Sequence, residues 1–486
     1  MTQRYDLIIR NGTVIDGTRA PRFSADLAVK DGRIAAIATG GELDGARADS
    51  ELDAGGRIVA PGFIDAHTHD DRLLLSSPDM SPKVSQGVTT VVAGNCGVSL
   101  AQVAFKGRPP VPPLDLLDSS GEWFRFPRFR DYVEELQGKP AAANAVLLAG
   151  HSTLRVAVMD NLERTATPAE TACMREMLDE ALGAGAIGLS TGLYYEPARG
   201  ASTEEVIEIA RPLAEHGGLY CTHMRDEGDR VLDSLEETFR IGREVGVPVL
   251  VSHHKVVGTA NHGRSPQTLA AISKAMASQP VCLDCYPYEA SSTILTFDRT
   301  KIATRTIVTW SKPLPQHAGK DLSAIAAEMG VSEEEACTRL IPAGAIYFSM
   351  DDADVQRILA YEHTMVGSDG LPHDAAPHPR LWGTFPRVLG HYSRKLGLFP
   401  LETAIHKMTG LTARSFGLAD RGVLRVGAWA DITVFDAATV DEAVSFSVPI
   451  APAHGIDTVM VAGVPVWRAG APTGARPGKV LRRSAQ

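Results

Sequence analysis

The segment GFIDAHTHDD, residues 62–71, places two histidines one residue apart among three aspartates. The apolar residues before them predict a buried strand, and side chains two positions apart on a strand point to the same side. His67 and His69 would therefore face one direction where this strand ends. Imidazole, carboxylate and thiolate groups together form the donor set that Zn²⁺ prefers. A metal site at this place requires further donors from other segments.

Such donors stand at the ends of further apolar runs. These runs cover residues 87–95, 144–151, 186–192, 218–223, 247–254, 280–288 and 363–370. At or beside their last positions stand Cys96, His151, His223, His253, Lys255, Tyr286 and Asp369. One such histidine alone would be taken for a core residue. However, six of the 15 histidines fall at the ends of apolar runs, namely His67, His69, His151, His223, His253 and His254. If the runs are parallel strands whose carboxyl ends meet, the pattern predicts a metal site.

The runs alternate with amphipathic stretches, such as residues 168–184, 203–216 and 230–245. The sequence STEE at 202–205 has the form of a capping box and predicts a helix start. Apolar strands interleaved with helices indicate an α/β fold with a parallel sheet buried on both faces. With residues 57–67 as the first strand, the count of eight favours a (β/α)8 (TIM) barrel. A doubly wound open sheet is the alternative.

Both ends of the chain have a different pattern. Residues 1–60 and 417–486 contain short alternating segments separated by glycine and aspartate turns, as in hairpins. We expect them to form one small β domain beside a barrel at residues 61–416. The link between the seventh and eighth strands is far longer than an ordinary βα connection and carries helical pieces. Residues from about 287 to 345 are therefore predicted to be an inserted lid.

The composition excludes several classes of function. With 44% hydrophobic and 22% charged residues, the 486-residue chain resembles a soluble globular protein. A net charge of −10 without a basic block gives no electrostatic basis for binding nucleic acid. Because no apolar run reaches the roughly 18 residues of a membrane span and the first residues lack a secretion signal, we expect a cytoplasmic protein without membrane contact. The six cysteines are expected to be free thiols or ligands. No pattern predicts an oligomeric state.

Five motifs carry a resemblance to a known family. They are PGFIDAHTHDD (61–71), SQGVTTVVAGNCG (85–97), THMRDEG (222–228), VSHHK (251–255) and GSDGLPHDAAPHPRLWGTFPR (367–387). Nearly from end to end, the chain resembles the amidohydrolase superfamily and, within it, the D-aminoacylases or N-acyl-D-amino-acid deacylases. The resemblance implies a distorted, metal-binding TIM barrel with a small β-sandwich built from both chain ends. It also implies hydrolysis of N-acyl-D-amino acids to a carboxylate, such as acetate, and the free D-amino acid.

The resemblance further implies two metal positions. The first position maps to His67, His69 and Asp369. The second position, which in this family binds Zn²⁺ tightly, maps to Cys96, His223 and His253. The first is expected to be weakly occupied or empty. Many superfamily members bridge two metals with a carboxylated lysine, and Cys96 fills that place here.

Asp369 is the predicted general acid/base, because amide hydrolysis needs a carboxylate that takes a proton from water and passes it to the leaving amine. A helix N-cap within SDGLP is the alternative for this residue. The predicted substrate-binding residues are Lys255, Tyr286, Ser292, Arg380 and His151. A guanidinium, an ammonium and a phenol suit the substrate carboxylate. For His151, an ordinary core histidine is an equal alternative.

Three residues of the predicted insert and its vicinity bear on which side chain the substrate carries. Tyr347 and Met350 would suit apolar D-amino acids, which we expect, whereas Arg299 would suit D-glutamate or D-aspartate. Two other functions stay open. One is a hydrolase of cyclic amides, a group that usually carries the bridging lysine. The other is a non-catalytic scaffold or a structural zinc site. For the deacylase, the expected partner is a small-molecule N-acyl-D-amino acid.

Overall fold

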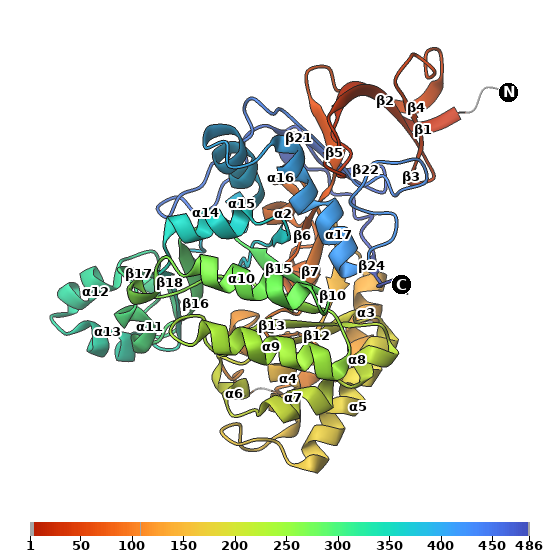
Figure 1. The fold of residues 1–486 in the computed structure, drawn as a ribbon. Helices are drawn as coiled ribbons and strands as arrows, with labels where there is room; N and C mark the ends of the chain where they lie inside the picture. Colours follow the sequence, from red (N-terminus) through yellow and green to blue (C-terminus); the bar gives the residue numbers. More distant parts are fainter. Residues whose placement is uncertain (1–3, 107, 485–486) are drawn as a thin grey trace.

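A closed parallel barrel is the central feature of the computed structural model, which describes residues 4–106 and 108–484 (Figure 1). Its strands are β6 (Phe63–Asp65), β7 (Val88–Ala93), β10 (Asn144–Leu147), β11 (Ala149–Gly150), β12 (Gly188–Gly192), β13 (Leu219–His223), β14 (Val249–Val251), β15 (Val281–Cys285) and β19 (Thr364–Val366). β10 and β11 are two halves of one strand, the first paired with β7 and the second with β12. The backbone N–H of Ala66 donates to the Val366 carbonyl at 3.2 Å and closes the barrel. The predicted (β/α)8 barrel is confirmed.

Helices follow most of these strands and cover the barrel. The main ones are α3 (Phe129–Gly138), α4 (His151–Val158), α5 (Pro168–Ala184), α7 (Thr203–Ala210), α8 (Pro212–Glu215), α9 (Val231–Val245), α10 (Ser265–Met276), α14 (Asp352–Ala360), α15 (Arg380–Arg387), α16 (Leu401–Met408) and α17 (Gly410–Phe416). The Ser202 side chain accepts from the backbone N–H of Glu205, as the capping motif predicts. The predicted helix 203–216 is divided into α7 and α8, because Pro212 has no backbone N–H to donate. No described helix is long and apolar enough to cross a membrane.

Both ends of the chain contribute to one sheet beside the barrel, as predicted (Figure 1). Its strands are β1 (Arg4–Val14), β2 (Phe23–Lys30), β3 (Arg33–Ala38), β4 (Arg47–Asp53), β5 (Ile58–Pro61), β20 (Ile432–Phe435), β21 (Ile456–Val461), β22 (Val464–Arg468) and β23 (Ala471–Pro472). They form a single nine-stranded hydrogen-bonded sheet, in which β5 and β20 join the two ends in antiparallel register. We call it the end sheet.

The apolar run 57–67 serves both the end sheet and the barrel. Its first part is β5, and its second part is β6, which pairs with β7. The break falls at Gly62, where an added Cβ would lie 2.2 Å from side-chain atoms of Thr89. Only glycine fits this close approach. Gly62 therefore allows the chain to pass from the end sheet to the barrel at this point.

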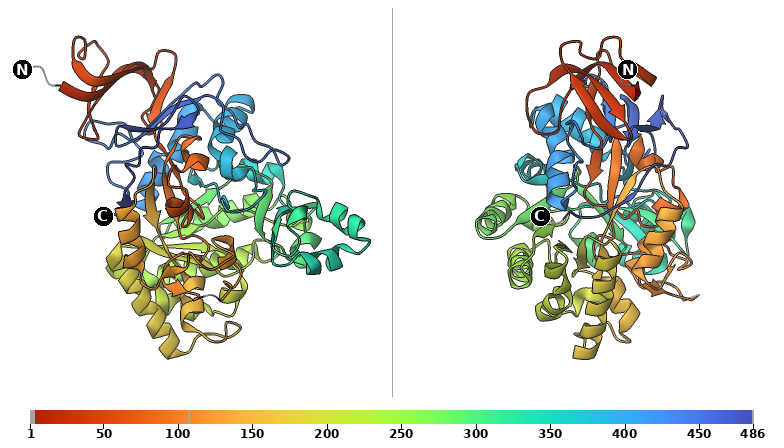
Figure 2. Two further views of the ribbon diagram at one scale, coloured as in Figure 1. Left: turned by 180° about the vertical axis from the view of Figure 1, so that it is seen from behind. Right: turned by 90° about the vertical axis from the view of Figure 1, so that its right-hand side faces the viewer.

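The long link between β15 and β19 is a folded unit and not a loose loop. It contains β16 (Ala290–Ile294), α11 (Phe297–Lys301), β17 (Arg305–Ser311), α12 (Leu322–Met329), α13 (Glu333–Leu340) and β18 (Ala343–Phe348). The three strands pair in the antiparallel order β16-β18-β17 and have a hydrophobic core of their own with the helices. Figure 1 and the left view of Figure 2 show this insert projecting from the side of the barrel.

One C-terminal strand lies outside the end sheet, which differs from the predicted division at residue 417. β24 (Val480–Leu481) pairs in parallel with β10 of the barrel. The side-chain carbonyl of Asn144 accepts from the Lys479 backbone N–H at 3.1 Å and strengthens this attachment. The place for β24 exists because the strand formed by β10 and β11 is interrupted, and two residues are too short to produce a recognisable sequence pattern.

Candidate metal centre

Three of the predicted ligands have an unusual backbone conformation. Cys96, His253 and Asp369 have φ angles of 54°, 37° and 50°, in the left-handed region that non-glycine residues rarely adopt. Each such residue costs of order 1–3 kcal/mol, and such strain is concentrated at functional sites. At these positions the chain leaves a barrel strand or its following turn, so the strain directs each side chain toward the barrel axis.

The six predicted ligands are brought together at one end of the barrel. The donor atoms form two groups, and within each group all atoms lie within 4.8 Å of one another. The first group is His67, His69, Cys96 and Asp369, and the second is Cys96, His223 and His253. The Cys96 sulfur lies 3.3 Å from Nε2 of His67 and 3.2 Å from Nε2 of His253. Oδ1 of Asp369 lies 3.2 Å from Nε2 of His69. Cys96 therefore belongs to both groups.

The donor atoms are arranged to bind a metal ion and do not satisfy one another through hydrogen bonds. Both ring nitrogens of His223 are buried without a hydrogen bond to any described residue, although Oε2 of Glu227 is 3.5 Å from Nε2. An imidazole buried without a partner is costly, and a metal ion held by the group would supply a partner for one of these nitrogens. Thiolate, imidazole and carboxylate are the ligands of zinc sites, so the residues present fit Zn²⁺.

The electrostatics of the cluster also favour a cation. Burial alone would raise the pKa of the Cys96 thiol, but His67 and His253 hold that pKa well below its ordinary value. Cys96 is thus a thiolate, the form that binds metals. Burial alone would lower the pKa of His69, but Asp369 and Cys96 raise it to about 9. The negative charge of this cluster therefore attracts protons and metal ions to the same atoms.

Two buried carboxylates that the sequence analysis missed support the histidines. Oδ1 of Asp284 accepts from the His253 backbone N–H at 2.9 Å, and Oδ2 lies 3.6 Å from Nδ1 of His67. Oε1 of Glu227 lies 3.2 Å from Nδ1 of His253 and accepts from Lys255 Nζ at 2.7 Å. Such outer carboxylates fix the tautomer and orientation of ligating histidines. Both residues lie within four positions of a predicted strand end, a signal of nearness to the site that does not reveal which histidines they contact.

Four predicted substrate-binding residues lie next to this cluster. Arg380 is fully buried, and its Nη2 lies 3.0 Å from Oδ2 of Asp369 and 3.1 Å from the Ser292 carbonyl. The guanidinium carbon is 4.5 Å from the ring centre of Tyr286. Nε and Nη1 of Arg380 have no hydrogen-bond partner among the described residues, so two donors remain for an anion. Lys255 lies 5.7 Å from the same ring, but it is paired with Glu227.

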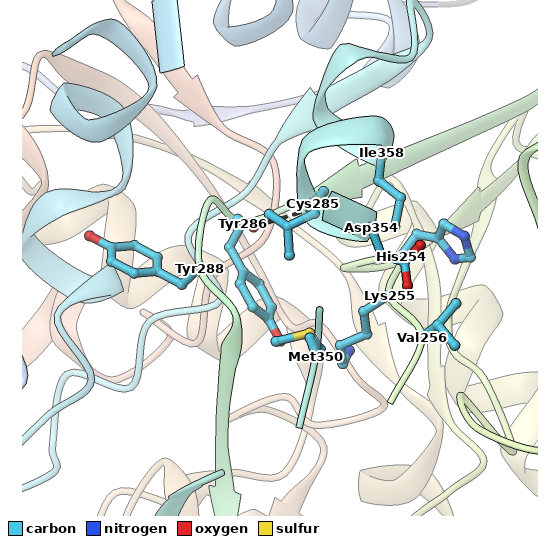
Figure 3. A pocket seen from close by; sticks show the side chains of 10 residues that line it. His254, Lys255, Val256, Cys285, Tyr286, Tyr288, Met350, Asp354 and Ile358 are labelled. Atoms are coloured by element: carbon cyan, nitrogen blue, oxygen red, sulfur yellow. Dashed lines mark hydrogen bonds between the residues drawn. The ribbon is translucent and has the colours of Figure 1, made fainter. Parts of the chain in front are cut away.

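Lys255 and Tyr286 also line a small cavity behind this part of the site (Figure 3). The hydroxyl of Tyr286 reaches the sulfur of Met350 at 3.9 Å. Figure 3 shows these two side chains and Lys255 directed to the same space, while Tyr288 points away. Met350, one of the residues expected near an apolar substrate group, therefore contacts the predicted carboxylate-binding set.

His151 lies in another cluster. Its Nε2 is 3.5 Å from Oε1 of Glu205, which also pairs with Arg155. These residues belong to α4 and α7 on the outside of the barrel. Glu205, the ionic partner of the His151 ring, is not one of the six predicted ligands. The position supports the alternative of a core histidine.

The insert forms one wall of a cleft beside the cluster. Arg299 of α11 donates from Nε to the Tyr194 hydroxyl at 3.0 Å, and the Tyr194 ring lies 5.7 Å from the ring of His223. Next to it is a cleft of about 470 Å³, bounded by Lys301 and Ile302 of the insert and by loops 226–229 and 257–261 of the barrel. A substrate in this cleft would meet residues of the insert.

Comparison with known proteins identifies the group to which this arrangement belongs. A family model described as the amidohydrolase family matches residues 50–308 and 322–467. The chain belongs to the amidohydrolase family. The match covers the barrel together with strands of the end sheet, so the family assignment rests on most of the chain.

Within the amidohydrolase family, the predicted likeness to the D-aminoacylases is confirmed. The chain is 58% identical to the D-aminoacylase of Alcaligenes xylosoxydans xylosoxydans over 484 residues, which are 100% of this chain and 99% of the relative. A solved structure of D-aminoacylase, described for its binuclear metal centre, is 57% identical with a TM-score of 0.95, covering 99% of this chain and 100% of the other. N-acyl-D-glutamate deacylase from Bordetella bronchiseptica, complexed with zinc and a phosphonate inhibitor, is 46% identical with the same TM-score and coverage.

Proposed function

We propose that this amidohydrolase hydrolyses N-acyl-D-amino acids to a carboxylate and the free D-amino acid, using Zn²⁺. The observation that carries the proposal is the position of Asp369 between the donor cluster and Arg380. Its Oδ1 faces His69, and its Oδ2 is paired with the buried guanidinium. A carboxylate that acts on the amide and a cation that binds the substrate carboxylate are thereby adjacent. The full-length likeness to a D-aminoacylase supports the choice of substrate.

Cys96, His223 and His253 would hold the tightly bound ion, and His67, His69 and Asp369 would form the weaker position. Bound there, Zn²⁺ would activate water as a nucleophile and polarise the amide carbonyl. The pairing with Arg380 supports the weakness of the first position, because the guanidinium already neutralises one oxygen of Asp369. A second cation near Asp369 would be repelled by this charge.

Asp369 would transfer the proton during the reaction. Since Oδ2 accepts from Arg380 Nη2, Oδ1 is the oxygen left to take the proton from water and deliver it to the departing amine nitrogen. Nε and Nη1 of Arg380 would bind the carboxylate of the substrate. The Tyr286 ring packs against this guanidinium and keeps it in place.

A paired assay tests the proposal. We expect purified protein to contain Zn²⁺ and to release acetate from N-acetyl-D-methionine but not from N-acetyl-L-methionine. Equal release from both forms, or activity that survives complete removal of metal, would contradict it. A cyclic amide such as a hydantoin serves as the control substrate for the cyclic-amide alternative, and no opening of its ring is expected.

A second candidate, deacylation of acidic D-amino acids, is favoured by Arg299. Arg299 is 8% exposed, and no carboxylate lies within 4.0 Å of its guanidinium among the described residues. The hydrogen bond and ring contacts of this guanidinium are to tyrosines. A buried cation without a counter-ion suits an anionic group. N-acetyl-D-aspartate and N-acetyl-D-glutamate belong in the same assay, and a kcat/KM above that of N-acetyl-D-methionine would select this candidate.

Replacing Arg380 with alanine is expected to raise KM for N-acetyl-D-methionine by about 10–100-fold, because charge-assisted hydrogen bonds are worth about 1.5–3 kcal/mol. The uncharged N-acetyl-D-methioninamide should show a much smaller change in KM. Arg387 on the same helix is a matched control, since it pairs with Glu442 and not with Asp369. Equal losses on both substrates would exclude the proposed carboxylate contact.

A further inference from the structure

A fully buried lysine lies behind the first group of donors. Lys83, on the short helix α2 (Ser81–Val84), has no exposed side-chain surface. Its Nζ donates to Oδ2 of Asp65 at 2.9 Å and to the Ser368 hydroxyl at 2.8 Å. Oδ2 of Asp70 lies 3.4 Å from the same atom. One ammonium thus joins three chain segments inside the protein.

Each of these partners is a close neighbour of a residue assigned to the first metal position. Asp65 precedes His67 by two residues, Asp70 follows His69, and Ser368 precedes Asp369. The contacts continue through the backbone, because Oδ1 of Asp65 accepts from the Ser368 N–H at 2.7 Å and from the His67 N–H at 3.3 Å. The Asp369 N–H in turn donates to the His67 carbonyl at 2.8 Å.

We propose that Lys83 is a positioning residue that sets the geometry of the first metal position, His67, His69 and Asp369, and leaves the second position unaffected. The inference rests on the proposed metal centre and adds the residue that aligns one half of it. Lys83 draws the end of the first barrel strand and the turn after the last strand toward one point. The seam where the barrel closes is thereby held in the register that brings Asp369 to the histidines.

The charge of Lys83 is essential for this role. Burial alone would lower its pKa, but Asp65 and Asp70 hold that pKa above its ordinary value, so the group is an ammonium at neutral pH. Without it, two buried carboxylates would face each other with no cation between them, and they would separate or take up protons. Either change would move the backbone next to His67 and His69.

The second position has support that does not pass through Lys83, although Asp284 also approaches His67 at 3.6 Å. Asp284 and Glu227 hold His253 through its backbone N–H and its Nδ1. Neither carboxylate contacts Lys83, whose acidic partners among the described residues are Asp65 and Asp70. Loss of Lys83 should therefore weaken one metal position selectively, which a general loss of stability would not do.

The variant Lys83→Met tests the inference through metal binding. Zn²⁺ is titrated into chelator-treated protein with a competing chelator, and the two binding phases are fitted separately. We expect the affinity of the weaker phase to fall by about 10–100-fold, the range for partners of ligating residues, while the tighter phase changes less than about threefold. Lys407→Met is the matched control. It removes another buried lysine, whose Nζ donates to the carbonyls of Tyr361 and Thr364, and it should leave both phases unchanged.

A milder variant covers the case in which Lys83→Met does not fold. Ser368→Ala removes one acceptor of the ammonium and should weaken the same phase in the same direction. Equal weakening of both phases, no change in either, or the absence of a second phase in the wild type would overturn the inference. If the wild type still hydrolyses N-acetyl-D-methionine in those cases, the proposed function stands. If the wild type neither binds Zn²⁺ nor hydrolyses the substrate, the proposed function itself fails.

Discussion

Replacing Asp369 with asparagine is expected to lower kcat by about 10²–10⁴-fold, the usual contribution of a general acid/base. The carboxamide can still contact Arg380, but it cannot carry the proton from water to the departing amine. Asparagine is the appropriate replacement, because it tolerates a φ angle near 50°, the value observed at this position. Steady-state turnover of N-acetyl-D-methionine and zinc content measured on the same preparation give the result.

Zinc content shows whether Asp369→Asn loses activity because a catalytic group is missing or because the metal site is disrupted. The tightly bound ion should remain, since its proposed ligands are Cys96, His223 and His253. Asp420→Asn is a matched control, because Asp420 also has a positive φ, of 58°, and pairs with arginines of the surface. If Asp369→Asn keeps zinc and turns over within tenfold of the wild type, Asp369 is not the acid/base.

The second large effect is expected for Cys96→Ala. The sulfur contacts both donor groups, so its removal should affect both metal positions together. Outer partners of a metal ligand alone account for about 10–100-fold in affinity or activity, and loss of the central ligand should therefore exceed 100-fold in kcat/KM. Zinc per chain after dialysis should fall in parallel. The backbone strain is the same for cysteine and alanine, since both carry a Cβ.

Cys221→Ala is the matched control for this variant. Cys221 is equally buried in strand β13, and burial raises the pKa of its thiol well above the ordinary value. It is therefore a neutral packing residue, and its replacement should preserve zinc and activity. Cys96→Ala protein that retains a full complement of tightly bound zinc would show that the sulfur is not a ligand.

Much of the metal centre was predictable because of the way a parallel barrel is built. His67 and His69 lie two residues apart, which places both on one side of the chain. Cys96, His223, His253 and Asp369 each stand at or just beyond the end of an apolar run, and a barrel brings all such ends to one face. The division of the six into two sets came from the resemblance. By distance, His67, His69, Asp369 and Cys96 form one group, and Cys96, His223 and His253 form the other.

The supporting residues were not predictable in this way. Asp284, Glu227 and Lys83 act through contacts with strands that are distant in the sequence, and no spacing within a segment records such contacts. The same limitation applied to His151, which stands at a strand end like the ligands. The side chain turns outward to Glu205 because the strand formed by β10 and β11 ends there and α4 begins. A position at a strand end therefore predicts nearness to the site but not direction.

The pairing of β24 with β10 has a consequence for how the molecule forms during translation. Asn144 and Lys479, which join the two segments, are 335 residues apart in the chain. A ribosome releases the segment around β10 long before the segment that contains β24, so the early half of the barrel emerges with one strand position still open. Contacts of such long sequence separation also form slowly. The nascent barrel wall thus has an exposed edge for most of synthesis, and β24 covers it in one of the last steps.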